Sequence, residues 1–186
     1  MKKPKKMLCR QHQLRIAYEL KDKEYFLRYA MPCLIAKVMA HKLSEKEYNS
    51  LIKQFREGKD FSQEQLWKLF EYAMRKLLVI SIEKNKIQGG KAIIDKETIK
   101  EYFWFKHPQA VLFKNTFVEL CLVLPAKVIQ KRGKKYFVET PLGSREIYAW
   151  EDLGIGDFVT VHYNYACEKI GEKDYSELKK FLDGVI

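Results

Sequence analysis

Cys121 and His162 are two potential metal ligands that stand in patterned apolar stretches of the C-terminal third of the chain. A thiolate is a soft ligand suited to low-spin iron, and an imidazole is a borderline ligand. Two protein ligands do not close a structural tetrahedral site, which takes four. The pair therefore suits a transient carrier or a site shared with a partner. There His162 would hold or protonate a partner group, because its charge changes near neutral pH.

The cysteines do not form a familiar metal or disulfide pattern. The chain has four cysteines (Cys9, Cys33, Cys121 and Cys167), and no C-x-x-C occurs. This spacing fits neither a zinc ribbon nor a small disulfide scaffold, so we expect free thiols in a reducing cytosol. Cys167 follows His162 closely and is an accessory candidate for the site. For both Cys121 and Cys167 the alternative explanation is a thiol buried in the core.

The surroundings of this pair form an ordered series of short motifs. Cys121 opens the stretch C-L-V-L-P-A-K-V, and His162 closes the stretch G-D-F-V-T-V-H. The other landmarks follow in order: Gly133, Val138-Glu139, Gly143-Ser144-Arg145 and, after His162, Tyr165-Ala166. Over residues 119–183, about a third of the chain, this series resembles the small hydrogenase maturation chaperones of the HypC/HupF type.

The resemblance implies both a fold and a function. It implies an OB-like barrel that helps to assemble the iron centre of [NiFe] hydrogenases, with Cys121 and His162 as the functional pair. The implied partners are an iron–sulfur scaffold maturation protein and the hydrogenase large-subunit precursor. The implied cargo is iron with cyanide and carbon monoxide ligands, held transiently, with no tightly bound cofactor. Pro125, Tyr165 and Cys167 are accessory candidates for the site.

The sequence departs from the family pattern at three points. The family cysteine normally follows the initiator Met, whereas about 120 residues precede Cys121 here. Ala126 and Asn164 stand where the family usually has glycine. These changes are compatible with an intact barrel and an altered choice of partner.

The secondary structure that must position these residues is expected to change from helices to strands near residue 117. Up to there, apolar residues recur at helical spacing, with capping-box starts at Ser44 and Ser62 and a cap at Asp95. Gly89-Gly90 is expected to break the helix that starts at Ser62. The helices are expected over residues 14–30, from Ser44 to Gly58, from Ser62 to Gly89, and from Asp95 to about Phe105, before His107-Pro108.

After residue 117 the apolar pattern alternates, and turn residues recur about every ten positions, which indicates a small barrel. The sequence therefore predicts an α+β protein with two domains. Residues 1–117 form a basic all-α helical domain, and residues 118–186 form an OB-like β-barrel with a C-terminal helix. The expected strands are 121–129, 136–139, 145–150 and 158–166, and the expected terminal helix is 174–182.

Net charge separates the same two parts. The 186 residues contain 35 Lys and Arg against 24 Asp and Glu, a net charge of +11. Residues 1–119 hold 25 basic and 14 acidic residues, whereas residues 120–186 hold 10 of each. The charge indicates an acidic partner surface for the helical part. The alternative is a nucleic-acid-binding protein, in which Lys2, Lys3, Lys5 and Lys6 contact phosphates and barrel aromatics stack on bases.

Several other classes of function are not indicated. The chain has no phosphate-binding glycine loop, no G-x-S-x-G and no H-E-x-x-H, so we expect no enzyme. No apolar run is long enough for a membrane span. The basic start lacks the apolar stretch of a signal peptide, so a cytoplasmic location is expected. The abundance of Lys, Glu, Ile and Tyr is compatible with a thermophile.

Overall fold

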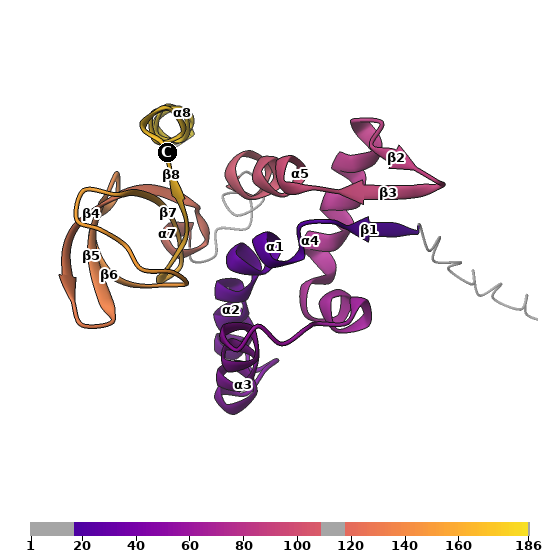
Figure 1. Cartoon of the computed structure of the whole chain (residues 1–186), viewed down its shortest axis with the longest axis horizontal. Helices are drawn as coiled ribbons and strands as arrows, with labels where there is room; N and C mark the ends of the chain where they lie inside the picture. The colour runs from indigo at the N-terminus through magenta and orange to yellow at the C-terminus, as the bar shows by residue number, and fades with distance from the viewer. Residues whose placement is uncertain (1–16, 109–117, 186) are drawn as a thin grey trace, which may run out of the picture.

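A closed five-stranded β-barrel occupies the C-terminal part of the chain (Figure 1). The computed structural model describes residues 17–108 and 118–185. The barrel order is β4-β5-β6-β8-β7, and β7 returns to pair with β4. The β6–β8 pair is parallel, and the other pairs are antiparallel. The strands are β4 (Leu124–Arg132), β5 (Lys135–Thr140), β6 (Gly143–Ala149), β7 (Phe158–His162) and β8 (Tyr165–Ile170).

Alternating burial along the strands fills the barrel. In β5, Tyr136, Val138 and Thr140 are buried while their neighbours are more exposed, as expected for a strand with one face in a core. Gly133 turns the chain from β4 into β5 with φ +59°, a backbone conformation that favours glycine. The terminal helix α8 (Glu172–Asp183) packs against β4 and β7.

Two predicted strands differ from the observed ones, the first by a shift along the chain and the second by a break. A short helix, α7 (Val118–Cys121), precedes β4, so Cys121 is helical and the strand begins at Leu124. The predicted strand 158–166 is interrupted by a turn at Tyr163-Asn164, which separates β7 from β8. Tyr163 has φ +53°, which a bulky side chain rarely adopts. An alternating apolar pattern continues through such a tight hairpin, which explains the error.

The part before residue 109 is helical, as predicted from its caps. Ser44 and Ser62 each form a complete capping box, with Glu47 and Gln65 respectively, and Asp95 accepts from the main-chain N–H of Thr98. The helices are α1 (Lys23–Ala30), the 3₁₀ turn η1 (Met31–Cys33), α2 (Leu34–Met39), α3 (Glu45–Arg56), α4 (Gln63–Glu83), α5 (Lys96–Glu101) and the π-helical turn η2 (Tyr102–Lys106).

The prediction that this part is all-α was wrong. A three-stranded sheet, β1-β3-β2, lies at the end of the molecule away from the barrel (Figure 1). It pairs β1 (Tyr18–Leu20) in parallel with β3 (Lys91–Ile94), and β3 in antiparallel with β2 (Ile87–Gln88). Gly89-Gly90 is the hairpin turn between β2 and β3, not the end of a helix, since α4 already ends at Glu83. The β1–β3 pairing joins segments too distant for local periodicity to detect.

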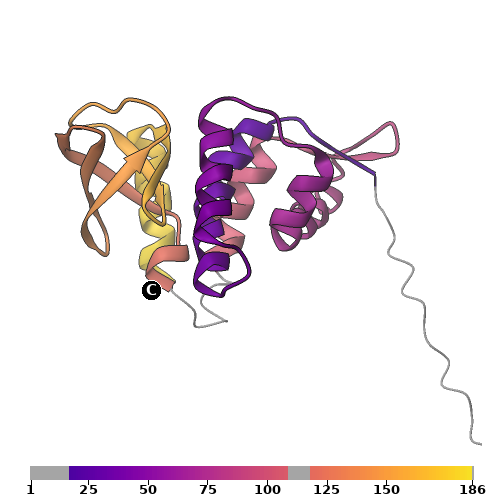
Figure 2. The same ribbon diagram turned by 90° about the horizontal axis from the view of Figure 1, so that it is seen from below.

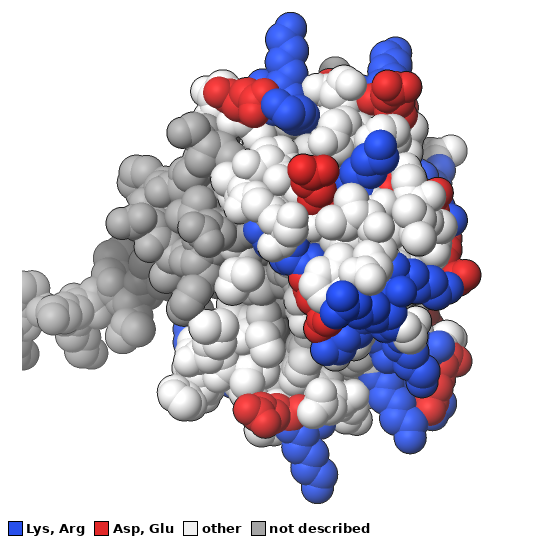
Figure 3. Space-filling view, turned by 90° about the vertical axis from the view of Figure 1, so that its left-hand side faces the viewer, with Lys and Arg blue, Asp and Glu red and all other residues white. Residues whose placement is uncertain are grey.

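The barrel and the helical part lie side by side in both views (Figures 1 and 2). Helix α1 packs against β8, and ion pairs and hydrogen bonds cross between the parts. On the face that carries the barrel, acidic and basic side chains are interspersed around broad uncharged areas (Figure 3). That distribution agrees with the zero net charge of residues 120–186.

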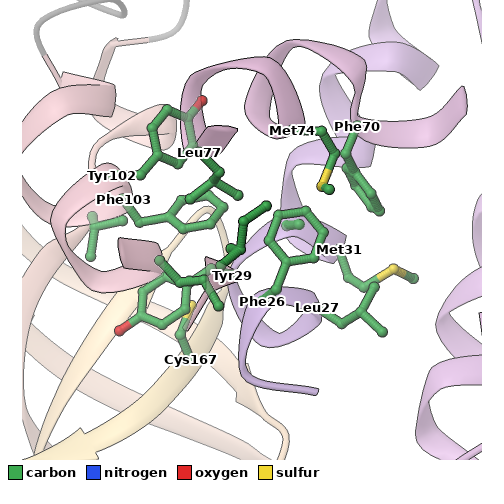
Figure 4. Packing of buried hydrophobic residues seen from close by; sticks show 14 of the residues in the cluster. Phe26, Leu27, Tyr29, Met31, Phe70, Met74, Leu77, Tyr102, Phe103 and Cys167 are labelled. Atoms are coloured by element: carbon green, nitrogen blue, oxygen red, sulfur yellow. The ribbon is translucent and has the colours of Figure 1, made fainter. Parts of the chain in front are cut away.

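One hydrophobic cluster extends across the predicted boundary at residue 117. It joins residues of the helical part, such as Phe26 and Phe103, to Leu122, Cys167 and Leu178 of the barrel part. Figure 4 shows Tyr29, Phe103 and Cys167 close together in this cluster, although they come from α1, η2 and β8. A second cluster fills the barrel interior. The two parts are therefore held together by buried apolar contacts.

No helix among the described residues is both long and apolar enough to cross a membrane.

Candidate functional site

His162 ends strand β7, and its side chain is fully buried between the barrel and the helical part. Its Nδ1 atom lies 2.9 Å from the main-chain carbonyl oxygen of Tyr29 in α1. Since a carbonyl only accepts, Nδ1 carries the proton of the neutral ring. Burial lowers the pKa of His162 to about 4, and hydrogen bonds with the backbone of Tyr29 and Cys121 oppose part of this effect.

Two residues of the helical part converge on this imidazole. The ligand atoms of Cys33, His107 and His162 all lie within 4.8 Å of one another. The Cys33 Sγ atom is 3.6 Å from Nε2 and 3.7 Å from Nδ1 of His162. The two imidazole rings meet edge to face, with centroids 5.6 Å apart. A thiol and two imidazoles at this spacing form a set of donors that can bind a transition-metal ion.

Local backbone geometry brings these groups together. Cys33 ends the 3₁₀ turn η1, and His107 directly follows the π-helical turn η2. Phe103 of that turn contacts both imidazoles, with ring centroids 5.9 Å from each. Single π-helical turns are rare and occur frequently at functional sites, because the extra residue changes the direction of the side chains that follow.

A buried polar network fixes Tyr29, which accepts the hydrogen bond from His162. The Tyr29 hydroxyl donates to Glu168 at 2.5 Å and lies 2.9 Å from the Thr160 hydroxyl. It also accepts from the indole N–H of Trp104 at 3.0 Å. Glu168 and Thr160 belong to the barrel, so this network aligns α1 with strands β7 and β8 behind the site.

Cys121 lies next to this site but turns its thiol elsewhere. Its Sγ is 2.6 Å from the hydroxyl of Tyr163, the residue after His162. Burial raises the pKa of the half-buried Cys121 thiol, while the hydrogen bond with Tyr163 opposes this shift. The pairing of Leu124 with Val161, together with a hydrogen bond from Tyr163 N–H to the Leu120 carbonyl, holds Cys121 and His162 at one end of β4 and β7.

The accessory candidates fall at three different kinds of position. Cys167 is buried in β8, within the cluster that joins the two parts, and is not in the Cys33–His107–His162 group. Pro125 is buried in β4 opposite Thr160. Tyr165 stacks on Trp150 with centroids 4.3 Å apart. Lys2, Lys3, Lys5 and Lys6, the candidates for phosphate contact, lie outside the described residues.

Sequence reasoning did not identify Cys33 and His107 as partners of His162. Each stands beside a proline, Pro32 and Pro108, at a point where the helical pattern stops. That was the available local signal, and it does not indicate that the two residues meet. Their contact with His162 depends on how the helical part docks on the barrel.

A basic and aromatic cleft of about 370 Å³ lies between the two parts, away from the Cys–His group. The guanidinium of Arg56 lies 5.9 Å from the centre of the Trp150 ring and 6.0 Å from that of Tyr165. Arg28 bridges Glu24 and Glu151 in the same cleft. Its lining also includes Lys23, Leu27, Phe55, Gly58, Lys59, Asp60 and Phe61.

Neither a protein-family model nor a curated protein matches this chain.

Proposed function

We propose that this protein is an accessory protein of metallocentre assembly, similar in action to the HypC/HupF-type hydrogenase maturation chaperones. In this proposal the barrel is OB-like and engages an iron–sulfur scaffold protein and a hydrogenase large-subunit precursor. The cargo is iron with its cyanide and carbon monoxide ligands. The protein acts by binding and positioning, and we propose no chemical turnover.

The main observation behind the proposal is that the residue that opens one motif and the residue that closes the other lie at the same end of the barrel. The motif residues Cys121 and His162 stand at the same end of the paired strands β4 and β7. A half-buried soft thiol at this end of the barrel suits a site that a partner completes, since one thiol cannot close a metal site alone. The barrel order β4-β5-β6-β8-β7, with its parallel β6–β8 pair, supports the OB-like assignment.

The exposure of the two residues gives them different roles in the proposal. His162 is fully buried, so it would hold the end of β7 and the adjoining turn. Cys121 is half-buried and would be the group that meets the partner. The exposed side chains of Leu120 and Ile155 on the barrel part add apolar surface to which a partner protein could bind. The basic helical part would contact acidic surface of the same partner.

Capture of purified partners tests the proposal. The full chain is immobilised and presented with a hydrogenase large-subunit precursor, and separately with its iron–sulfur scaffold protein. We expect both to bind the wild type and Cys9→Ala, the matched thiol control, and to be lost or at least tenfold weaker with Cys121→Ala. Circular dichroism verifies that the variant is folded. Equal capture by Cys121→Ala, or no capture by the wild type, would contradict the proposal.

The cleft around Arg56 and Trp150 favours a second candidate, single-stranded nucleic-acid binding. Cations and aromatic rings at one place suit phosphates and stacked bases. Against it, Tyr136, Tyr163 and Tyr165 are buried and offer no free ring face for stacking. Oligonucleotide affinity measured at two salt concentrations distinguishes the candidates, because phosphate contacts weaken steeply with salt.

A further inference from the structure

We propose that Cys33, His107 and His162 form a binding site for one divalent cation of the zinc class, at the seam between the helical part and the barrel. The proposal does not rest on partner binding by Cys121. Two of its three ligands come from the helical part, outside the segment that carries the family resemblance.

The distances fit a small transition-metal ion. Zinc binds thiolate sulfur at about 2.3 Å and imidazole nitrogen at about 2.0–2.1 Å in a tetrahedron, which sets the sulfur and nitrogen roughly 3.6 Å apart. Cys33 Sγ and His162 Nε2 are 3.6 Å apart. All three ligand atoms lie within 4.8 Å of one another, so each pair has to close by at most about 1.5 Å to reach tetrahedral spacing.

The outer contacts orient the two imidazoles as in known metal sites. A ligating histidine usually donates its second ring N–H to a carbonyl, a carboxylate or water, which fixes both tautomer and ring direction. The Nδ1 of His162 makes such a bond to the Tyr29 carbonyl, which leaves Nε2 as the ligating atom. Cys33 Sγ lies 3.6 Å from Nε2 and 3.7 Å from Nδ1, over the ring face, so the ring has to turn to direct its Nε2 lone pair at a shared ion. The Tyr102 hydroxyl lies 3.3 Å from Nδ1 of His107 and fills the corresponding position there.

The chemistry of the donors selects the class of cation. Calcium and magnesium prefer oxygen ligands, which this group does not offer. A thiolate with two imidazoles suits zinc, and also cobalt or iron in the divalent state. Burial keeps the Cys33 thiol protonated in the protein without metal, and a bound cation would deprotonate it. Three protein ligands leave a fourth position open for water or an external ligand.

The surroundings show that the group is built into the fold. The ligands come from η1, from the end of the π-helical turn η2 and from β7, three elements that meet only when both parts are docked. Phe103 packs against both imidazoles and forms an apolar wall. The Tyr29 network anchors the carbonyl behind His162 to Glu168 and Thr160. Such a shell keeps the three side chains near one another without the ion.

Cobalt titration of the whole chain tests the site. The protein is stripped with a chelator under reducing, anaerobic conditions and titrated with Co²⁺. We expect one ion per chain, a thiolate-to-cobalt charge-transfer band, visible bands typical of tetrahedral cobalt, and loss of all of them when Zn²⁺ is added. Binding without the thiolate band, or no binding, would overturn the proposal.

Variants identify the ligands. Cys33→Ser should abolish the charge-transfer band, and His107→Gln should weaken binding by about a hundredfold or more, beyond the usual cost of losing an outer partner. The matched control Cys9→Ser should bind as the wild type does, and Cys121→Ser tests the competing assignment of the thiol ligand and should keep the band. If Cys33→Ser does not fold, two measurements still decide the assignment: cobalt binding by His107→Gln, and X-ray absorption of the wild-type cobalt protein, with one sulfur and two imidazoles expected. Retention of the band in Cys33→Ser and its loss in Cys121→Ser would overturn the assignment.

The outcomes also separate this site from the proposed function. Partner capture by Cys33→Ser, with metal binding lost, would leave the chaperone-like function standing and the two activities separate. Metal binding by Cys121→Ala, with partner capture absent even in the wild type, would leave the metal site standing alone.

Discussion

The imidazole of His162 donates a hydrogen bond of 2.9 Å to the main-chain carbonyl of Tyr29, and this bond joins the end of a barrel strand to the first helix of the chain. The acceptor is main chain, so its position depends on how helix α1 lies on the barrel. The hydroxyl of the same tyrosine forms hydrogen bonds with Glu168 and Thr160. Both the main chain and the side chain of Tyr29 therefore connect helix α1 to the barrel.

Tyr29→Phe should destabilise the protein by about 1–3 kcal/mol, because it removes a hydroxyl from a buried network and leaves Trp104 without its acceptor. Urea unfolding monitored by tryptophan fluorescence measures the change. Tyr72→Phe is the matched control, because Tyr72 is an exposed tyrosine outside this hydrogen-bond network. An equal effect of both substitutions would argue against the importance of the network.

Phe103→Ala should cost about 3–5 kcal/mol, the range for a large aromatic removed from a packed core. Phe103 stacks on Tyr29 and contacts His107 and His162. The substitution should therefore lower Tm and weaken Co²⁺ binding together. Calorimetry and cobalt titration measure the two effects. Loss of stability with unchanged metal affinity would mean that the aromatic wall does not hold the ligands.

The Asp157 carboxylate has a structural role that explains the G-D motif before β7. It accepts from the main-chain N–H of Gly154 at 2.8 Å and pairs with Lys169 at 2.8 Å, and these bonds lower its pKa. The folded pKa lies below the unfolded value near 3.8, so the stabilisation is complete above that value and is lost as pH falls through the folded pKa.

Asp157→Ala should accordingly lose about 1 kcal/mol at pH 7, and the deficit against wild type should shrink below pH 4. Asp157→Asn should retain part of the stability through the Gly154 contact. Unfolding free energies measured from pH 7 to pH 3 test this expectation. A deficit that does not change with pH would show that the charge of Asp157 contributes nothing.

The thiols should differ in reactivity according to how strongly their pKa values are raised. Cys121 is half-buried, and its hydrogen bond to Tyr163 opposes the rise in its pKa. Cys33 and Cys167 have pKa values raised well above the usual value by burial. Alkylation near pH 8, followed by peptide mass spectrometry, should therefore modify Cys121 before Cys33 and Cys167. Faster modification of Cys167 would contradict the described packing of the core.

Sequence patterns predicted local structure well and long-range contacts poorly. The capping boxes at Ser44 and Ser62 depend on residues a few positions apart, and they were confirmed. The β1–β3 pairing was missed because its partners are distant in sequence. The motif identified His162 as a candidate. Cys33 and His107 contact it only because the helical part docks on the barrel, and the spacing of apolar residues within one helix or strand does not indicate such docking.

The hydrophobic cluster shared by the two parts has an evolutionary consequence. A gene for the barrel alone would encode a chain without the helical half of this cluster, and part of the apolar surface around Leu122, Val123 and Cys167 would face water. Selection against aggregation would then oppose fission of the gene near residue 117, and would equally oppose recombination that exchanged one half for a homologue. The helical and barrel segments should consequently be inherited as a single unit, with substitutions along their shared face changing in concert.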